Sequence, residues 1–113
     1  MDLNFSVKVD QANSVPVVTI SGELDVYSCP ELRKILVDLI EKHHHTNLIL
    51  DLESIRYIDS TGLGTIASTA QSLQQKSSTI FVLCTKPQIK RIFQISGLDK
   101  KNIKLIDHIK DAG

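Results

Sequence analysis

The alternation of apolar runs with helix-period stretches is the feature that most constrains how this chain folds. Residues 48–52 form a nearly continuous apolar run, which is typical of a central strand covered on both faces. Further strand-like runs occupy 79–84 and 103–106, and stretches with helical spacing occupy 28–45, 60–75 and 85–97. Because crossovers through helices join parallel strands, this order predicts an α/β fold.

The N-terminal part of the sequence predicts an antiparallel hairpin. Residues 5–9 alternate apolar and polar side chains, as a half-buried strand does. Residues 11–14 have turn composition, and 15–20 are again rich in β-branched residues. The hairpin and the later strands together predict a mixed β-sheet packed against helices. A chain of 113 residues is long enough for one core, so we expect a single domain over 1–113.

Composition narrows the classes of function. Thirteen basic and thirteen acidic residues cancel, so no surface that neutralises nucleic-acid phosphates is expected. Every apolar stretch is too short to span a membrane, and the first residues lack the basic and apolar segments of a secretion signal. Two cysteines, Cys29 and Cys84, are too few for a disulfide framework, and we expect both to be reduced in a cytoplasm.

Residues with capping chemistry stand before the first and the last predicted helix. The spacing of Ser28 and Glu31 predicts a capping box, and Thr85 with Gln88 repeats the pattern. Each pair is accompanied by a proline in the first turn, where its missing N–H is tolerated. Gly97 is the predicted C-terminal stop of the last helix.

The turn at 58–65 is harder to explain by folding alone. It places a hydroxyl, that of Ser60, at the start of the central helix as the predicted N-cap. Gly62 and Gly64 lower helix propensity by about 0.8–1.0 kcal/mol each, and their missing side chains would let another surface approach closely. The residues expected to pack beneath the turn are Ile55, Tyr57 and Ile58.

Two motifs carry a family resemblance. The stretch Asp59-Ser60-Thr61-Gly62-Leu63-Gly64, with Gly22-Glu23-Leu24-Asp25 upstream, resembles the bacterial anti-sigma-factor antagonists of the STAS family. The resemblance extends over nearly the whole chain in the order and length of its elements. It implies that a partner protein phosphorylates Ser60, and that Asp25 and Asp59 flank Ser60 with negative charge. The partner-binding residues that it implies are Gly22, Glu23, Leu24, Asp25, Asp59, Ser60, Thr61, Gly62, Leu63 and Gly64.

The resemblance also implies a switching cycle. The partner is an anti-sigma factor that is itself an ATP-dependent serine kinase; the unphosphorylated chain binds it and frees a sigma factor. A serine phosphatase resets Ser60, and the chain acts in the cytoplasm as a monomer or weak dimer. No cofactor, catalytic residue or metal is expected. Two alternatives stay open: a STAS protein of another serine-kinase or stress-signalling module, and a module that binds a nucleotide or small ligand.

A small enzyme and a metal site are the remaining hypotheses. Ser60 lies outside a Gly-x-Ser-x-Gly motif, and a nucleophilic serine also needs a base within hydrogen-bond reach. His43, His44 and His45 belong to the far end of another helix, and His108 lies in the tail. Neighbouring histidines on a helix point in different directions, so the three are read as solvated residues near a helix C-terminus. The missing Walker lysine and the acidic flanks argue against a nucleotide site.

Overall fold

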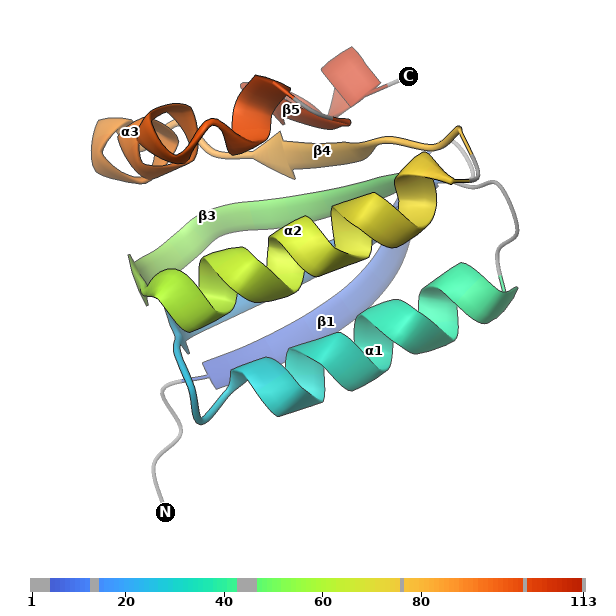
Figure 1. Ribbon diagram of the computed structural model, residues 1–113, viewed down its shortest axis with the longest axis horizontal. Helices are drawn as coiled ribbons and strands as arrows, with labels where there is room; N and C mark the ends of the chain where they lie inside the picture. The colour runs from blue at the N-terminus through green and yellow to red at the C-terminus, as the bar shows by residue number, and fades with distance from the viewer. Residues whose placement is uncertain (1–4, 13–14, 43–46, 76, 101, 113) are drawn as a thin grey trace.

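The computed structural model describes residues 5–12, 15–42, 47–75, 77–100 and 102–112. In these ranges five strands form one sheet, whose spatial order follows the sequence (Figure 1). The strands are β1 (Phe5–Ala12), β2 (Val15–Leu24), β3 (Leu48–Ile58), β4 (Ile80–Leu83) and β5 (Ile103–Ile106). β1 pairs antiparallel with β2, and the other three neighbouring pairs are parallel. The predicted α/β fold is confirmed.

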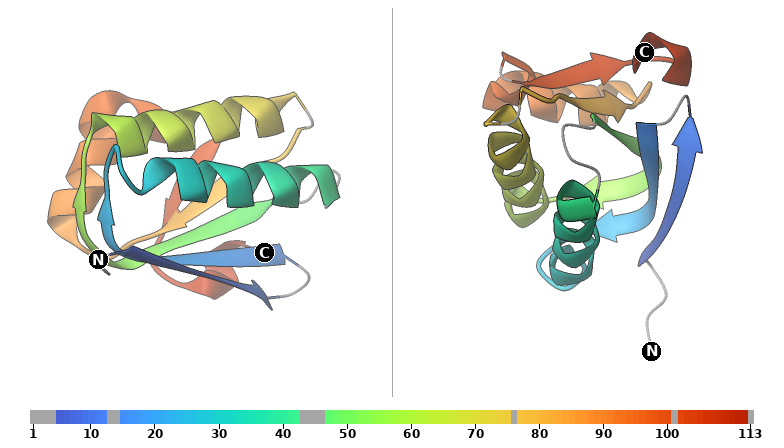
Figure 2. Two further views of the ribbon diagram at one scale, coloured as in Figure 1. Left: turned by 90° about the horizontal axis from the view of Figure 1, so that it is seen from below. Right: turned by 90° about the vertical axis from the view of Figure 1, so that its right-hand side faces the viewer.

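Three α-helices connect the parallel strands. They are α1 (Cys29–Lys42), α2 (Ser60–Gln74) and α3 (Pro87–Ser96); the short 3₁₀ helices are η1 (Leu98–Lys100) and η2 (Ile109–Ala112). α1 and α2 lie side by side over one face of the sheet (Figure 2). The sequence predicted the end of the first helix at 42–45; the described helix ends at Lys42, and His43, His44 and His45 lie outside the described residues.

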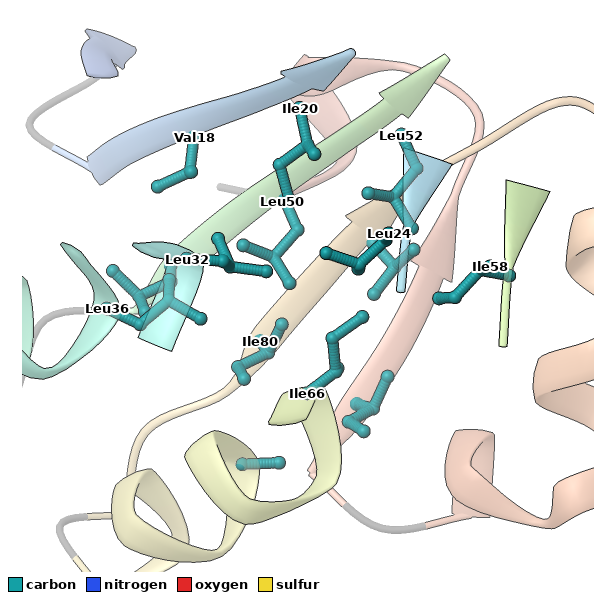
Figure 3. Packing of buried hydrophobic residues seen from close by; sticks show 14 of the residues in the cluster. Val18, Ile20, Leu24, Leu32, Leu36, Leu50, Leu52, Ile58, Ile66 and Ile80 are labelled. Carbon is teal, nitrogen blue, oxygen red and sulfur yellow. The ribbon is translucent and has the colours of Figure 1, made fainter. Parts of the chain in front are cut away.

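The main core fills the space between the sheet and the helices. Strand side chains such as Leu24 and Leu50 meet Leu32 of α1 and Ile66 of α2, and all four are fully buried (Figure 3). A second cluster is formed by Val17, Ile49, Phe81, Leu83, Ile106 and Ala112. Neighbouring residues of β3, such as Ile49 and Leu50, therefore belong to different clusters, which explains the continuous apolar run.

Two strands are longer than the sequence indicated. β2 continues through Leu24 and β3 through Ile58, and these two residues are paired in the parallel register. The pairing shifts between Gly22 and Glu23, and Gly22 has a φ of 96° that favours glycine. These irregularities interrupt the period-two pattern, so the sequence showed a loop where the strands are still paired.

The N-terminus of α3 differs from the predicted capping box. Its N-cap is Lys86, whose side chain makes no capping hydrogen bond, whereas the Thr85 hydroxyl donates to Glu53 at 2.9 Å. The predicted capping box is therefore wrong: the helix begins at Pro87, so Thr85 lies one residue before the N-cap, and its hydroxyl makes a charge-assisted hydrogen bond with a carboxylate. The C-terminal stop is confirmed, because Gly97 adopts a left-handed conformation with a φ of 76°.

Three features of the described ranges concern membrane spanning, metal binding and the state of the cysteines. None of their helices has both the length and the apolar character needed to cross a bilayer. Their His, Cys, Asp and Glu residues form no group of three that is placed to hold a metal ion. Cys29 and Cys84 are free and buried, as expected for cysteines that act as small apolar residues.

Candidate functional site

The turn that joins β3 to α2 is organised by Asp59. Its Oδ1 atom accepts hydrogen bonds from the backbone N–H groups of Thr61, at 2.9 Å, and Gly62, at 3.1 Å. Asp59 is therefore the N-cap, and the prediction that Ser60 caps the helix is wrong: Ser60 is the first helical residue. Both residue types are good caps, but the carboxylate adds a negative charge at the positive end of the helix dipole.

Two substitutions of Asp59 separate the contribution of its charge to stability from that of its hydrogen bonds. Asp59→Ala should lower the free energy of unfolding by about 1 kcal/mol, because two backbone donors lose their acceptor. Asp59→Asn should retain most of that stability, since an amide oxygen caps nearly as well. Urea denaturation of the three proteins measures the difference. Equal stability of wild type and Asp59→Ala would contradict the capping role.

Ser60 and Thr61 are adjacent hydroxyl-bearing residues at this helix start, and both are exposed. The Thr65 hydroxyl donates to the Thr61 carbonyl, one helical turn earlier, at 3.1 Å. His108, the one histidine in the described ranges, lies after β5 rather than on an element that adjoins the turn. The arrangement offers an accessible hydroxyl without a described histidine base beside it.

The upstream motif lies beside this turn, as the family resemblance implied. Leu24 pairs with Ile58 at the ends of β2 and β3, and the Asp59 N–H donates to the Leu24 carbonyl at 3.2 Å. Glu23 pairs with Tyr57 in the same register. The two motifs are therefore joined by backbone pairing, although more than thirty residues separate them in sequence.

A compact turn follows the upstream motif and precedes α1. The Asp25 carboxylate accepts from the N–H groups of Tyr27, at 3.0 Å, and Ser28, at 3.1 Å. The Ser28 hydroxyl donates to the Glu23 carbonyl at 2.8 Å and accepts from the Asp25 N–H at 3.0 Å. The predicted capping box of Ser28 with Glu31 is wrong: the Ser28 hydroxyl bonds the strand end instead, where part-buried backbone groups need partners.

Cys29 lies where the two acidic residues approach α1. Its side chain is buried, and burial raises the pKa of the Cys29 thiol; the negative charges of Asp59 and Asp25 raise it further, against a hydrogen bond with Thr65. The thiol therefore stays protonated at neutral pH and is a poor nucleophile. Asp25 and Asp59 lie near one another in the chain fold, because the Asp59 N–H donates to the carbonyl of Leu24, the residue before Asp25.

The two glycines of the turn have different surroundings. A β-carbon on Gly62 would lie 2.9 Å from the Leu24 carbonyl oxygen, and equally close to side-chain atoms of Leu24 and Ile58. A β-carbon on Gly64 would meet nothing within 4 Å. The expectation that Gly62 leaves room for another surface is wrong, because the chain's own strand end fills that room. Gly64 alone is exposed.

The residues beneath the turn were predicted in part. Ile55 and Ile58 are buried there, as expected, but Tyr57 is 52% exposed. Sequence reasoning also missed Val26 and Tyr27, which are 55% and 89% exposed in the turn after Asp25. The signal that was available is their position between an acidic residue and a helix start, where an apolar side chain has little core to enter.

Comparison with known proteins gives consistent matches. The family model of the STAS domain matches residues 6–112. An anti-sigma-B factor antagonist of Staphylococcus epidermidis is 33% identical over 96 residues, which is 85% of this chain and 88% of that protein. The crystal structure of an anti-sigma factor antagonist from Mycobacterium paratuberculosis has a TM-score of 0.84 at 27% identity, covering 96% of this chain and 90% of that one.

A third protein has been solved in two states. The anti-sigma factor antagonist SpoIIAA matches in its unphosphorylated form with a TM-score of 0.74 at 19% identity, covering 94% of this chain and 92% of that one. The Bacillus cell fate determinant SpoIIAA in its phosphorylated form has a TM-score of 0.73 at 20% identity, covering 94% and 96%. The fold of this chain thus resembles both states to the same degree.

Proposed function

The chain belongs to the STAS domain family, and we propose that it is an anti-sigma factor antagonist switched by phosphorylation at Ser60. Unphosphorylated, it binds an anti-sigma factor that is a serine kinase, and a sigma factor is released. The observation that carries the proposal is the exposed Ser60 on a turn that Asp59 caps and the upstream motif adjoins.

The proposed contact surface contains only part of the two motifs. Ser60, Thr61 and Gly64 are exposed, and Glu23, Asp25, Asp59 and Leu63 are partly exposed. Gly22, Leu24 and Gly62 are buried, so we assign them the task of supporting the surface from beneath. Val26, Tyr27 and Tyr57 add exposed apolar area near the motifs, of the kind that anchors protein interfaces.

The proposed switch acts on the surface rather than on the fold. A phosphate adds about −1.5 to −2 charges at neutral pH. Two amide donors of the first turn are already bound to the Asp59 carboxylate, so the phosphate would meet an acidic cap rather than two free donors. The likeness of the fold to both states of SpoIIAA supports a domain that keeps its shape. A docked partner, in contrast, would meet an unpaired charge.

Phosphorylation should therefore weaken binding to the anti-sigma factor by at least about tenfold, equivalent to about 1.4 kcal/mol. Titration calorimetry with the purified anti-sigma factor compares the two forms. Ser60→Asp should reproduce the loss in part, because a carboxylate carries less charge and fewer acceptor oxygens than a phosphate. NMR shift changes on phosphorylation should be concentrated at residues 22–25 and 57–66. Changes spread over the sheet, or equal affinity of both forms, would contradict this mechanism.

The rest of the proposed cycle needs no chemistry from this chain. A serine phosphatase removes the phosphate from Ser60 and restores binding. The chain acts in the cytoplasm as one STAS domain, a monomer or weak dimer, and uses neither a nucleic acid nor a membrane. The buried, protonated Cys29 and the lack of a described histidine base near Ser60 support an interaction protein rather than an enzyme.

A further inference from the structure

The end of β3 that leads into the Ser60 turn extends beyond its neighbour β4. The parallel pairing of the two strands joins residues 48–51 to residues 80–83, where β4 ends. β3 continues to Ile58, paired on its other side with β2. Seven residues of β3 beyond Asp51 therefore have no strand partner on the β4 side, although Ile55 among them is fully buried.

The loop between β4 and α3, residues 84–86, contacts this part of β3 where no strand pairs with it. The Glu53 carboxylate accepts from the backbone N–H of Thr85 at 2.6 Å and from its hydroxyl at 2.9 Å. The Lys86 ammonium donates to the backbone carbonyl of Ile55 at 2.7 Å in a part-buried position. The loop thus contacts β3 at two residues, and Lys86 is the one that bonds a backbone group of the unpaired edge.

We propose that Lys86 is a positioning residue for the phosphoacceptor turn: its ammonium fixes the Ile55 carbonyl, and with it the strand end that places Asp59 and Ser60. The role of the residue in phosphorylation rests on the proposed function, whereas its role in ordering the turn does not. Lys86 lies outside both motifs and contacts neither of them directly through the hydrogen bonds of the described residues.

Two hydrogen bonds support this role. The Lys86 ammonium, which can only donate and so cannot cap the N–H groups of α3, reaches across to the Ile55 carbonyl of β3. A charged donor to a buried carbonyl is stronger than a neutral one, and the carbonyl would lose it on substitution. On the opposite edge, the Leu24 carbonyl holds the Asp59 N–H. The strand end is thus held from both sides, and removal of one contact should loosen the turn.

The test compares Lys86→Met with Lys86→Arg and with a control on the same helix. Methionine keeps an unbranched apolar stem but lacks the donor, and arginine keeps a charged donor. Lys90→Met also removes a positive charge from α3, but it breaks an exposed ion pair with Asp107, in which the two charged atoms are 2.7 Å apart. Amide hydrogen exchange of residues 59–63 is measured on each free protein, and the kcat/KM of Ser60 phosphorylation is measured with the anti-sigma factor kinase and ATP.

We expect amide exchange at residues 59–63 to be about threefold to tenfold faster in Lys86→Met, with exchange of the α1 amides unchanged. The loss of one hydrogen bond shifts the equilibrium for local opening of the turn by about this factor. The kcat/KM should fall by a similar factor, Lys86→Arg should restore most of both, and Lys90→Met should match wild type. Unchanged exchange in Lys86→Met, or an equal effect of Lys90→Met, would overturn the inference. If wild type takes up no phosphate at Ser60, the proposed function fails, and the exchange measurement still decides the positioning role.

Discussion

Ser60→Ala should abolish phosphate transfer from the anti-sigma factor kinase, with labelling reduced by at least about a hundredfold, whereas Thr61→Ala should be labelled like wild type. A missing acceptor oxygen leaves no bond for the phosphoryl group to form, so the loss should far exceed that of a mispositioned group. Both residues are exposed at the start of α2, and the resemblance to the family assigns the phosphate to the first of them. Radiolabelled ATP and mass spectrometry of the peptide provide the measurement.

The control for this experiment is the fold of Ser60→Ala itself. Asp59, not Ser60, provides the cap, so the substitution removes an exposed hydroxyl at a helical position where alanine is favourable. The melting temperature should therefore equal or slightly exceed that of wild type. Strong labelling of folded Ser60→Ala, or loss of labelling in Thr61→Ala alone, would show that the acceptor is assigned to the wrong hydroxyl.

Gly62→Ala and Gly64→Ala should change stability in opposite directions. A β-carbon at Gly62 would be 2.9 Å from the Leu24 carbonyl oxygen, a backbone atom that cannot rotate away. Overpacking of this kind costs about 1–3 kcal/mol, and the helix propensity of alanine returns about 1 kcal/mol. We place the steric cost at the upper end, so Gly62→Ala should lose about 2 kcal/mol and lower the Tm by about 8 °C.

Gly64→Ala is the matched control on the same helix, two residues away. Its β-carbon would meet nothing within 4 Å, and the exposed position keeps only the propensity gain of about 1 kcal/mol. Calorimetric scans of both variants and wild type measure the two shifts. A similar Tm change in both variants would contradict the structural role of Gly62. A loss of partner affinity in stable Gly64→Ala would support its place in the proposed contact surface.

The sequence predicted the order of the elements because their apolar periods are strong. The run at 48–52 and the stripe of α1 point to strand and helix without any tertiary information. The caps were harder, because Asp59 and Ser60 are both good N-cap types in adjacent positions, and only the observed hydrogen bonds distinguish them. The first residue of the helix could be predicted only to within one position.

The other errors of prediction come from contacts between residues that are far apart in the sequence. The crowding at Gly62 comes from Leu24, on a strand far away in sequence, so its glycine signal could not be told from that of Gly64. Thr85 had the spacing of a capping residue, but the helix begins one residue later than that spacing implied, and the Thr85 hydroxyl donates to Glu53, more than thirty residues earlier. Tyr57 was expected beneath the turn because it lies just before it in the sequence, but the pairing of β2 with β3 shifts between Gly22 and Glu23, and Tyr57, which pairs with Glu23, is exposed.

The carboxylate of Asp59 has a consequence for the rate of switching. Because this carboxylate already binds two N–H groups at the start of α2, we expect the domain to change its conformation little when Ser60 carries a charge. Adding or removing the phosphate then requires no slow rearrangement of the domain. The kinase and the phosphatase should each meet a folded substrate. The lifetime of each signalling state should be set by those enzymes and by dissociation of the partner complex. The phosphorylated and unphosphorylated forms would then differ in their affinity for the partner and not in the conformation of the domain.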